Sequence, residues 1–207
     1  MATGFNRDDL KNLEVRVEQL ENEMAAQVPL TFGPKDYRLG YYATTGFLLG
    51  SFGACTSLLA NVIGSVYLSH FTGEAQHPLR LIQVYLTFPM GEQALKADTG
   101  LLLTIGCVLY IGTGMLYGTF FQVVLSRFFP NSTVPARLVI CSLLALAIWI
   151  VNYYVVFSWL QPLMFGGDWI VAMVPAWVAA ATHLVFGWTM AIVYPLGEFR
   201  AYQTDVK

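Results

Sequence analysis

The sequence predicts an all-α integral membrane protein with four transmembrane helices and an N-terminal cytoplasmic amphipathic helix. Of its 207 residues, 56% are hydrophobic and only 12% are charged, whereas soluble domains carry about 25% charged residues. The charged residues also leave four gaps of 28 to 35 residues. A helix needs roughly 20 apolar residues to cross a hydrocarbon core of about 30 Å, so each gap holds one crossing and is too short for two.

We expect the four spans near residues 42–68, 99–125, 138–160 and 169–194, within a transmembrane domain of residues 41–198. The apolar runs are continuous, whereas the strands of a membrane β-barrel alternate between apolar and polar residues. A helix also satisfies every backbone amide within its own segment, as the lipid interior requires. The spans should therefore be helices.

Residues 1–27 are expected to form a cytoplasmic amphipathic or short coiled-coil helix. Five of its apolar residues are spaced alternately three and four residues apart, as the a and d positions of two heptads are. They are Leu10, Leu13, Val17, Leu20 and Met24. Two heptads are marginal for an isolated helix in water, so this helix needs a partner surface. That surface belongs either to another chain or to the cytoplasmic loops of this one.

Residues 28–40 read as an extended linker, because Pro29 and Pro34 interrupt any continuous helix. With four spans, both termini and the tail 199–207 lie on the same side of the membrane. That side holds Lys35, Arg38, Arg127, Arg137, Arg200 and Lys207, whereas the opposite side holds only Arg80 and Lys96. Cationic loops stay in the cytoplasm, which places both termini inside, in a bacterial inner membrane. The net charge of −2 argues against a nucleic-acid partner.

The loop of residues 70–97 on the outer side is unusually apolar. Its stretch PLRLIQVYLTFP carries a single charge and is too short to span the membrane. It is expected to be an interfacial helix or a segment buried against another subunit. Its partner-binding residues would be Leu81, Ile82, Val84, Tyr85 and Phe88.

Small residues are concentrated in the first two predicted spans. Gly46 and Gly50 form a GxxxG pair in the first span, and Gly114 and Gly118 form another in the second. Such pairs allow helix backbones to approach closely. They predict packing between the first two spans, with docking against a helix of a neighbouring subunit as the alternative.

Four polar residues make up the candidate intramembrane site: Asn61, Asn152, Thr182 and His183. The predicted spans contain no Asp, Glu, Lys or Arg, which argues against an ion-coupled transporter. The asparagines are interpreted as interhelical hydrogen-bonding residues. His183 is interpreted as a buried structural histidine, with contact to a quinone or one-sided ligation of a partner's haem as alternatives.

No enzyme motif of the HExxH, GxSxG or P-loop type occurs, so no catalytic residue is assigned. The three cysteines lie in three different spans without a CxxC pair, so no metal site is expected. No cofactor of its own is expected either, beyond contact with lipid, a quinone or a partner's haem.

A short internal echo relates the second and fourth spans. Residues 113–118 (TGMLYG) and 182–187 (THLVFG) match at an offset of 69 residues. A duplicated hairpin would produce this echo, so the four spans could form two tandem helical hairpins, but chance similarity explains so short a match equally well.

The stretch THLVFGWTMAIVY around His183 resembles the last helix of small four-helix bacterial membrane proteins that accompany respiratory complexes. The resemblance implies no catalytic residues. Spans without ionisable residues, a short heptad helix that needs a partner and an apolar outer loop predict a non-catalytic accessory subunit of a multisubunit complex, and the resemblance adds to this prediction. The complex would be respiratory or otherwise electron-transferring, with membrane lipids and other integral membrane subunits as partners. The alternative is a small homo-oligomeric channel or carrier.

Overall fold

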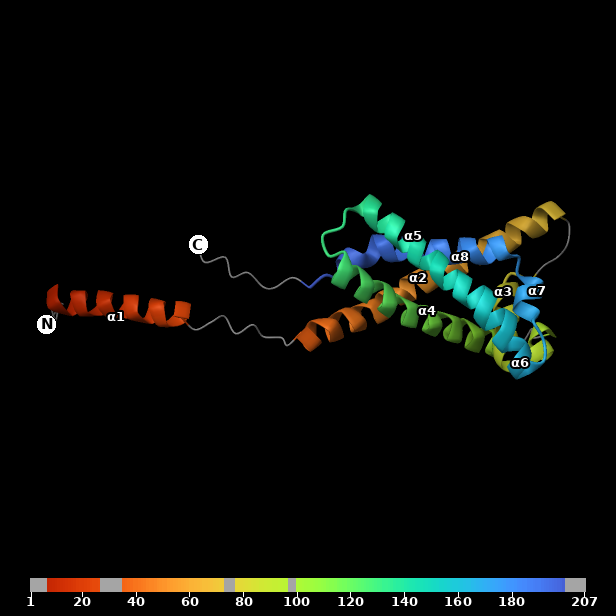
Figure 1. Cartoon of the computed structure of the whole chain (residues 1–207), viewed down its shortest axis with the longest axis horizontal. Helices are drawn as coiled ribbons and strands as arrows, with labels where there is room; N and C mark the ends of the chain where they lie inside the picture. The colour runs from red at the N-terminus through yellow and green to blue at the C-terminus, as the bar shows by residue number, and fades with distance from the viewer. Residues whose placement is uncertain (1–6, 27–34, 73–76, 97–99, 200–207) are drawn as a thin grey trace. The chain divides into compact units, whose positions relative to one another are not determined.

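The computed structural model describes residues 7–26, 35–72, 77–96 and 100–199, and every regular element among them is helical (Figure 1). The chain divides into two compact units, Met1–Arg38 and Leu39–Lys207. The first unit contains helix α1 (Arg7–Ala26), which covers the predicted heptad segment.

The second unit contains the four spans that the charge gaps predict. Four of its helical segments are long and apolar enough to cross a membrane. The described part of the chain therefore has four helical segments with the length and composition of membrane spans. The first span lies within helix α2 (Lys35–Thr72) and the second is helix α4 (Gly100–Phe128). The bounds of the spans are Arg38–Tyr67, Gly100–Phe128, Val134–Phe165 and Ala176–Gly197.

The third span is longer than predicted and is not uniformly α-helical. Helix α5 (Val134–Val151) continues without a break into a π-helix, η2 (Asn152–Leu160), and then into α6 (Gln161–Phe165). In a π-helix the backbone bonds join residues five apart, and such turns are rare and frequently occur at functional sites. The apolar pattern did not predict this change of helix type.

The fourth span begins at Ala176 rather than near residue 169. Residues Trp169–Met173 form a separate short helix, α7, and the span follows as α8 (Ala176–Val193) with a final 3-10 turn, η3 (Tyr194–Gly197). Val174 between them is extended, with φ −106° and ψ 110°. The ring of Pro175 disfavours a helical conformation for the residue before it, which explains the break.

The predicted linker of residues 28–40 is wrong in its second half. Helix α2 begins at Lys35, directly after Pro34, so residues 35–40 are helical. A proline limits the helix on its N-terminal side but leaves the residues after it free to be helical. The first part of the predicted linker, residues 28–34, lies outside the described residues, as does most of the tail.

The apolar loop between the first two spans folds back onto the bundle. It forms α3 (Arg80–Met90) and a 3-10 helix, η1 (Gly91–Lys96), and α3 lies with α6 and α7 at one end of the bundle (Figure 1). Ile82 and Leu86 are fully buried in a small core that Leu103 of α4 completes. The loop is therefore helical, and its buried apolar residues face this chain.

This packing corrects the predicted role of Ile82. Its side chain has no exposed surface, so it cannot anchor a partner, and Val84 is only 2% exposed. Leu81 and Tyr85 are half-buried and face a cavity within the bundle. The ring of Phe88 packs against those of Phe157 and Phe165, with ring centroids 6.1 and 5.3 Å apart. The high apolar content of this loop reflects burial within the chain itself.

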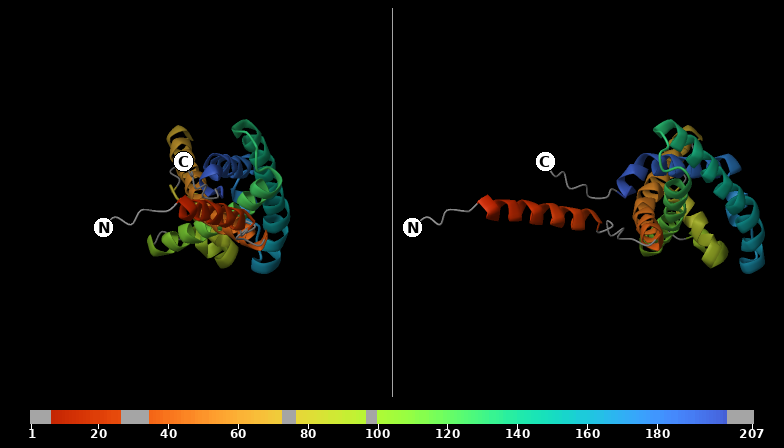
Figure 2. Two further views of the ribbon diagram at one scale, coloured as in Figure 1. Left: turned by 90° about the vertical axis from the view of Figure 1, so that its left-hand side faces the viewer. Right: turned by 60° about the vertical axis from the view of Figure 1, so that its left-hand side comes forward.

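Helices α2 and α4 cross at close range through the four glycines of the two GxxxG pairs (Figure 2). A Cβ atom at Gly46 would lie 2.7 Å from the carbonyl oxygen of Gly118, and one at Gly50 would lie 2.5 Å from that of Gly114. Only hydrogen fits at these positions. The structure thus places the four glycines at the contact between the first two spans.

A buried glutamine ties α3, α6 and α7 together. Gln161 has no exposed surface, and its Nε2 donates to Thr87 Oγ1 at 3.0 Å. Its Oε1 accepts the backbone N–H of Ile170, at 3.2 Å, at the start of α7. One side chain therefore fixes two short helices against the third span.

Replacing Gln161 with leucine should lower the stability of this end of the bundle. The change keeps the side-chain size but leaves the buried N–H of Ile170 without an acceptor, which costs about 1–3 kcal/mol. Thermal unfolding of the detergent-purified protein should show a lower Tm for Gln161→Leu than for Gln93→Leu, where the glutamine is exposed. Equal Tm values would contradict this role.

Candidate functional site

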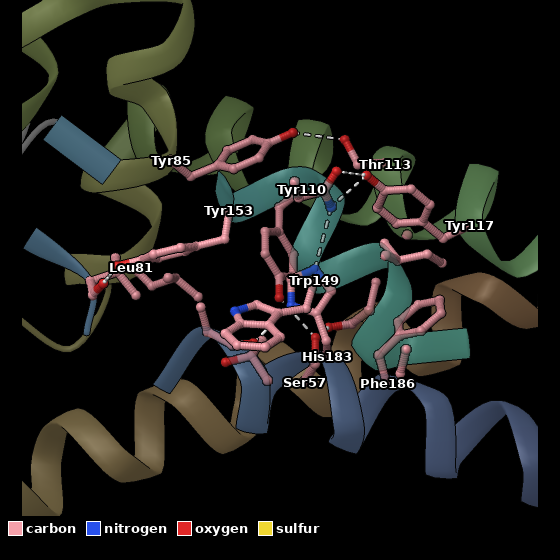
Figure 3. A pocket seen from close by; sticks show the side chains of 18 of the residues that line it. Ser57, Leu81, Tyr85, Tyr110, Thr113, Tyr117, Trp149, Tyr153, His183 and Phe186 are labelled. Carbon is pink, nitrogen blue, oxygen red and sulfur yellow. Dashed lines mark hydrogen bonds between the residues drawn. The ribbon is translucent and has the colours of Figure 1, made fainter. Parts of the chain in front are cut away.

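The candidate site is a partly open cavity lined by α2, α3, α4, α5, η2, α7 and α8. Its volume is about 140 Å³ and its wall is mainly apolar and aromatic. Figure 3 shows Tyr85, Thr113 and Tyr117 along one side of it and Ser57, His183 and Phe186 along the other. All of these elements belong to the second unit, so the cavity is internal to the four-span bundle.

The cavity lies deep within the predicted membrane thickness. Its α4 residues run from Tyr110 to Phe121, and Tyr110 is ten residues after the start of that helix at Gly100. At about 1.5 Å per residue, Tyr110 is about 15 Å from the helix end, close to the middle of a hydrocarbon core of about 30 Å.

Asn152, at the first position of the π-helix, connects two side chains on the cavity wall. Its Nδ2 donates to the hydroxyl of Tyr117 at 2.8 Å, and the Tyr117 hydroxyl donates to its Oδ1 at 3.0 Å. Its Nδ2 also lies 3.4 Å from His183 Nε2. Spans two, three and four thus meet at one asparagine.

The hydrogen bonds of His183 define its tautomer. Its Nδ1 lies 2.8 Å from the backbone carbonyl of Ala179, which can only accept, so Nδ1 carries the hydrogen. Nε2 of the neutral ring is then the acceptor, which matches the amide donor of Asn152. His183 is thus held by partners of this chain on both sides of the ring.

The other two residues of the predicted polar site bind each other. Asn61 Nδ2 donates to Thr182 Oγ1 at 3.0 Å and also to the carbonyl of Ser57 at 2.8 Å. The predicted set therefore forms two pairs, Asn61 with Thr182 and Asn152 with His183, and Thr182 and His183 are neighbours on α8. Asn152, Thr182 and His183 line the cavity.

Of the tyrosines of the wall, Tyr85 was predicted as a contact for a partner, whereas Tyr110, Tyr117 and Tyr153 were not predicted as site residues. The hydroxyl oxygen of Tyr110 lies 2.8 Å from Ser57 Oγ, and the hydroxyl oxygen of Tyr85 lies 2.7 Å from Thr113 Oγ1. The hydroxyl of Tyr153 donates to the carbonyl of Val174 at 2.9 Å. In the sequence these tyrosines resemble ordinary interfacial or packing residues, and nothing in their spacing shows that they face one cavity.

The two halves of the internal echo meet at the cavity. Thr113 and Thr182 occupy equivalent positions in the echo, as do Tyr117 and Phe186, and all four line the wall. The glycines that end the two halves also have matching roles. Gly118 packs against the backbone of α2, and Gly187 packs against the backbone of α5, where a Cβ atom at Gly187 would lie 2.8 Å from the carbonyl oxygen of Cys141. Each glycine contacts the first helix of its own hairpin. The echo therefore coincides with similar packing in both hairpins.

The described residues contain no group of three or more His, Cys, Asp or Glu side chains that could hold a metal ion. Cys55, Cys107 and Cys141 are free thiols in three separate helices. His77 is exposed, outside the spans, and is not part of the cavity wall that includes His183.

No family model, curated protein or solved structure matches this chain. The resemblance of the last span to respiratory accessory proteins stays a prediction.

Proposed function

We propose that this protein is a non-catalytic accessory or structural subunit of a multisubunit membrane complex, respiratory or otherwise electron-transferring. We place it in a bacterial inner membrane with both termini in the cytoplasm. The observation that carries the proposal is the row of apolar side chains along α1, which includes Leu13, Val17 and Leu20 and requires a partner surface. We call it the apolar row of α1.

The apolar row of α1 is not covered by any residue of its own unit. Leu13, Val17 and Leu20 are 49%, 51% and 50% exposed, and they recur at the a and d spacing of a coiled coil. Leu10 and Met24 belong to the same helix, but the structure does not describe their side chains. A row of this kind on a polar helix is stabilised when a second apolar surface covers it.

The wall of the cavity supports a non-catalytic role. Its described residues include no Asp, Glu, Lys or Arg, and proton or ion translocation relies on such groups within a membrane. The polar side chains of the wall bind one another, and this stabilises the fold. They offer no nucleophile paired with a base.

The test is purification of the tagged native protein in mild detergent, followed by mass spectrometry of bound chains and a haem and metal spectrum. Stoichiometric recovery with larger redox subunits would support the proposal and identify the complex. Deleting residues 1–26 should leave membrane insertion intact but reduce the recovery of partners, because the apolar row is then lost.

A point variant refines this test. Leu13→Ser combined with Leu20→Ser should reduce partner recovery as the deletion does, whereas Asn12→Ser with Gln19→Ser changes polar positions of the same helix and should not. Unchanged recovery with both the deletion and the leucine variant would remove α1 from the proposal.

The alternative, a small homo-oligomeric channel or carrier, needs polar residues on a face that other copies can share. Asn152, Thr182 and His183 instead line a cavity inside one bundle, so this alternative gains no support from their position. Recovery of the protein as a cofactor-free homo-oligomer would overturn the subunit proposal and favour the alternative.

A further inference from the structure

A positive charge is buried at the end of the bundle where α5 begins and α8 ends (Figure 1). Arg137 lies in the first turn of α5 and is only 7% exposed. Its guanidinium lies over the ring of Tyr194, the residue that follows α8, with Cζ 5.2 Å from the ring centroid. Tyr194 is itself 2% exposed, so the third and fourth spans hold the two side chains between them.

No residue that the structure describes supplies a counter-charge for Arg137. Its guanidinium makes neither an ion pair nor a hydrogen bond with any of them. Glu198, the acidic residue that follows the fourth span, is described and is not paired with it either. A buried charge is costly unless it is paired, so this arginine calls for an anion from outside the described chain.

The terminal nitrogens of Arg137 are the atoms that an anion can reach. Nε is fully buried and has no partner, so it is closed to a ligand. Nη1 and Nη2 make no hydrogen bond with a described residue but are not among the fully buried atoms, so they retain accessible surface. These two nitrogens form the planar edge of the guanidinium that can donate to two oxygens of one phosphate.

The start of α5 adds to this positive charge. The first N–H groups of a helix have no partner within it and carry a partial positive charge. Thr133 at the N-cap makes no side-chain hydrogen bond to them. A cation in the first turn is unfavourable next to this helix end, whereas an anion there is attracted by both the helix end and Arg137.

This end of the bundle lies at the level of the lipid headgroups. The third span has 32 residues, or about 48 Å of helix at about 1.5 Å per residue, whereas the hydrocarbon core is about 30 Å thick. A span centred on the core therefore extends about 9 Å beyond it at each end, and Arg137 is about 5 Å from the start of the span. The rings of Tyr41 and Phe199 pair nearby in the sequence of the first and fourth spans, with centroids 5.4 Å apart, as is typical of the membrane interface.

We propose that Arg137 binds the phosphate group of an anionic phospholipid through Nη1 and Nη2, beside the start of α5. The phosphate supplies the missing counter-charge at the depth where lipid phosphates lie. An anionic lipid is favoured over a zwitterionic one, because the cationic group of a zwitterionic headgroup partly neutralises its phosphate. The inference goes beyond the subunit role and holds whether or not that role is correct.

The test measures lipid binding to the full-length protein in detergent by native mass spectrometry. Dioleoyl phosphatidylglycerol and dioleoyl phosphatidylcholine have the same phosphate and acyl chains but differ in the net charge of their headgroups. Titration of the wild type should show one site per chain that binds phosphatidylglycerol more tightly than phosphatidylcholine.

Three variants locate this site. Arg137→Gln removes the charge and should weaken phosphatidylglycerol binding at the tightest site about tenfold, with little change for phosphatidylcholine. Arg137→Lys keeps the charge without the planar fork and should lose about threefold. The matched control is Arg127→Gln, at an exposed arginine near the same end of the bundle, and it should leave the tightest site unchanged.

Inorganic phosphate distinguishes a lipid from a free anion. Added in excess to the protein with bound phosphatidylglycerol, it should not displace the lipid, because it has no acyl chains to bury. Displacement would assign the site to free phosphate and overturn the proposal of a lipid.

Gel filtration shows which variants fold, and Arg137→Lys serves if Arg137→Gln does not. Equal phosphatidylglycerol affinity of the wild type and Arg137→Gln would overturn the proposal, as would equal affinity of the wild type for the two lipids. Loss of co-purifying chains from Arg137→Gln with unchanged lipid binding would assign the charge to a carboxylate of a partner instead.

Discussion

Replacing Gly118 with leucine should prevent the four-span bundle from folding. A Cβ atom at this position would meet the Cα of Gly50 and the carbonyl oxygen of Gly46, which are backbone atoms of α2. Backbone atoms cannot rotate away as a side chain can, so α2 and α4 would have to separate. Overpacking costs about 1–3 kcal/mol where side chains can adjust, and the cost here should exceed that range. Fluorescence-detected gel filtration of detergent extracts should show aggregated protein instead of a single peak.

The matched control is Gly112→Leu in the same helix. A Cβ atom at Gly112 would meet no heavy atom within 4 Å, so its side chain enters open space on the lipid side. The helix propensities of the two variants change equally, because glycine becomes leucine in a helix interior in both. A normal gel-filtration peak for Gly118→Leu would show that α2 and α4 do not depend on this contact.

Replacing Phe121 with alanine should produce the second largest effect. Phe121 has no exposed surface, and its ring centroid lies 5.5 Å from that of Phe186 on α8. In soluble proteins this change costs about 3–5 kcal/mol. Within a membrane the loss is mainly that of van der Waals contacts, since lipid is as apolar as the core. We therefore expect a cost at the lower end of that range, measured as a decrease in Tm or in resistance to denaturing detergent.

The neighbouring residue provides the control for this prediction. Phe120 is 46% exposed, so Phe120→Ala removes the same ring from a position next to lipid, where lipid chains can fill the space. Its Tm should remain close to that of the wild type. Equal decreases for the two variants would mean that Phe121 contributes no more to packing than a residue on the lipid side.

The predictions that held concern properties of single helices. The number of spans follows from the charge gaps, because a charged side chain within the hydrocarbon region is costly wherever it occurs in the sequence. Gly46, Gly50, Gly114 and Gly118 were predicted to pack the first two spans because a GxxxG pair creates a flat backbone surface on one helix face. Neither inference requires knowledge of the other helices.

The predictions that failed concern contacts between segments. Ile82 was expected to contact a partner because its segment is apolar and too short to span, but an apolar segment is compatible with burial against any surface. The fourth span starts after Pro175, because the proline disfavours a helical conformation at the residue before it, although the apolar run of the sequence continues across it. The apolar pattern does not predict the π-helix at Asn152, because a continuous apolar run is compatible with a π-helix and with an α-helix alike.

The sequence by itself determined that this chain has four helices long and apolar enough to cross a membrane, because the thickness and polarity of a bilayer set requirements on each segment separately. It also identified Asn152, Thr182 and His183 as polar residues at depth. Only the tertiary structure decided that these residues meet Tyr117 and Trp149 around one cavity. The positions of those side chains depend on how helices far apart in the sequence cross and rotate against each other, and that arrangement is a property of the packed bundle as a whole.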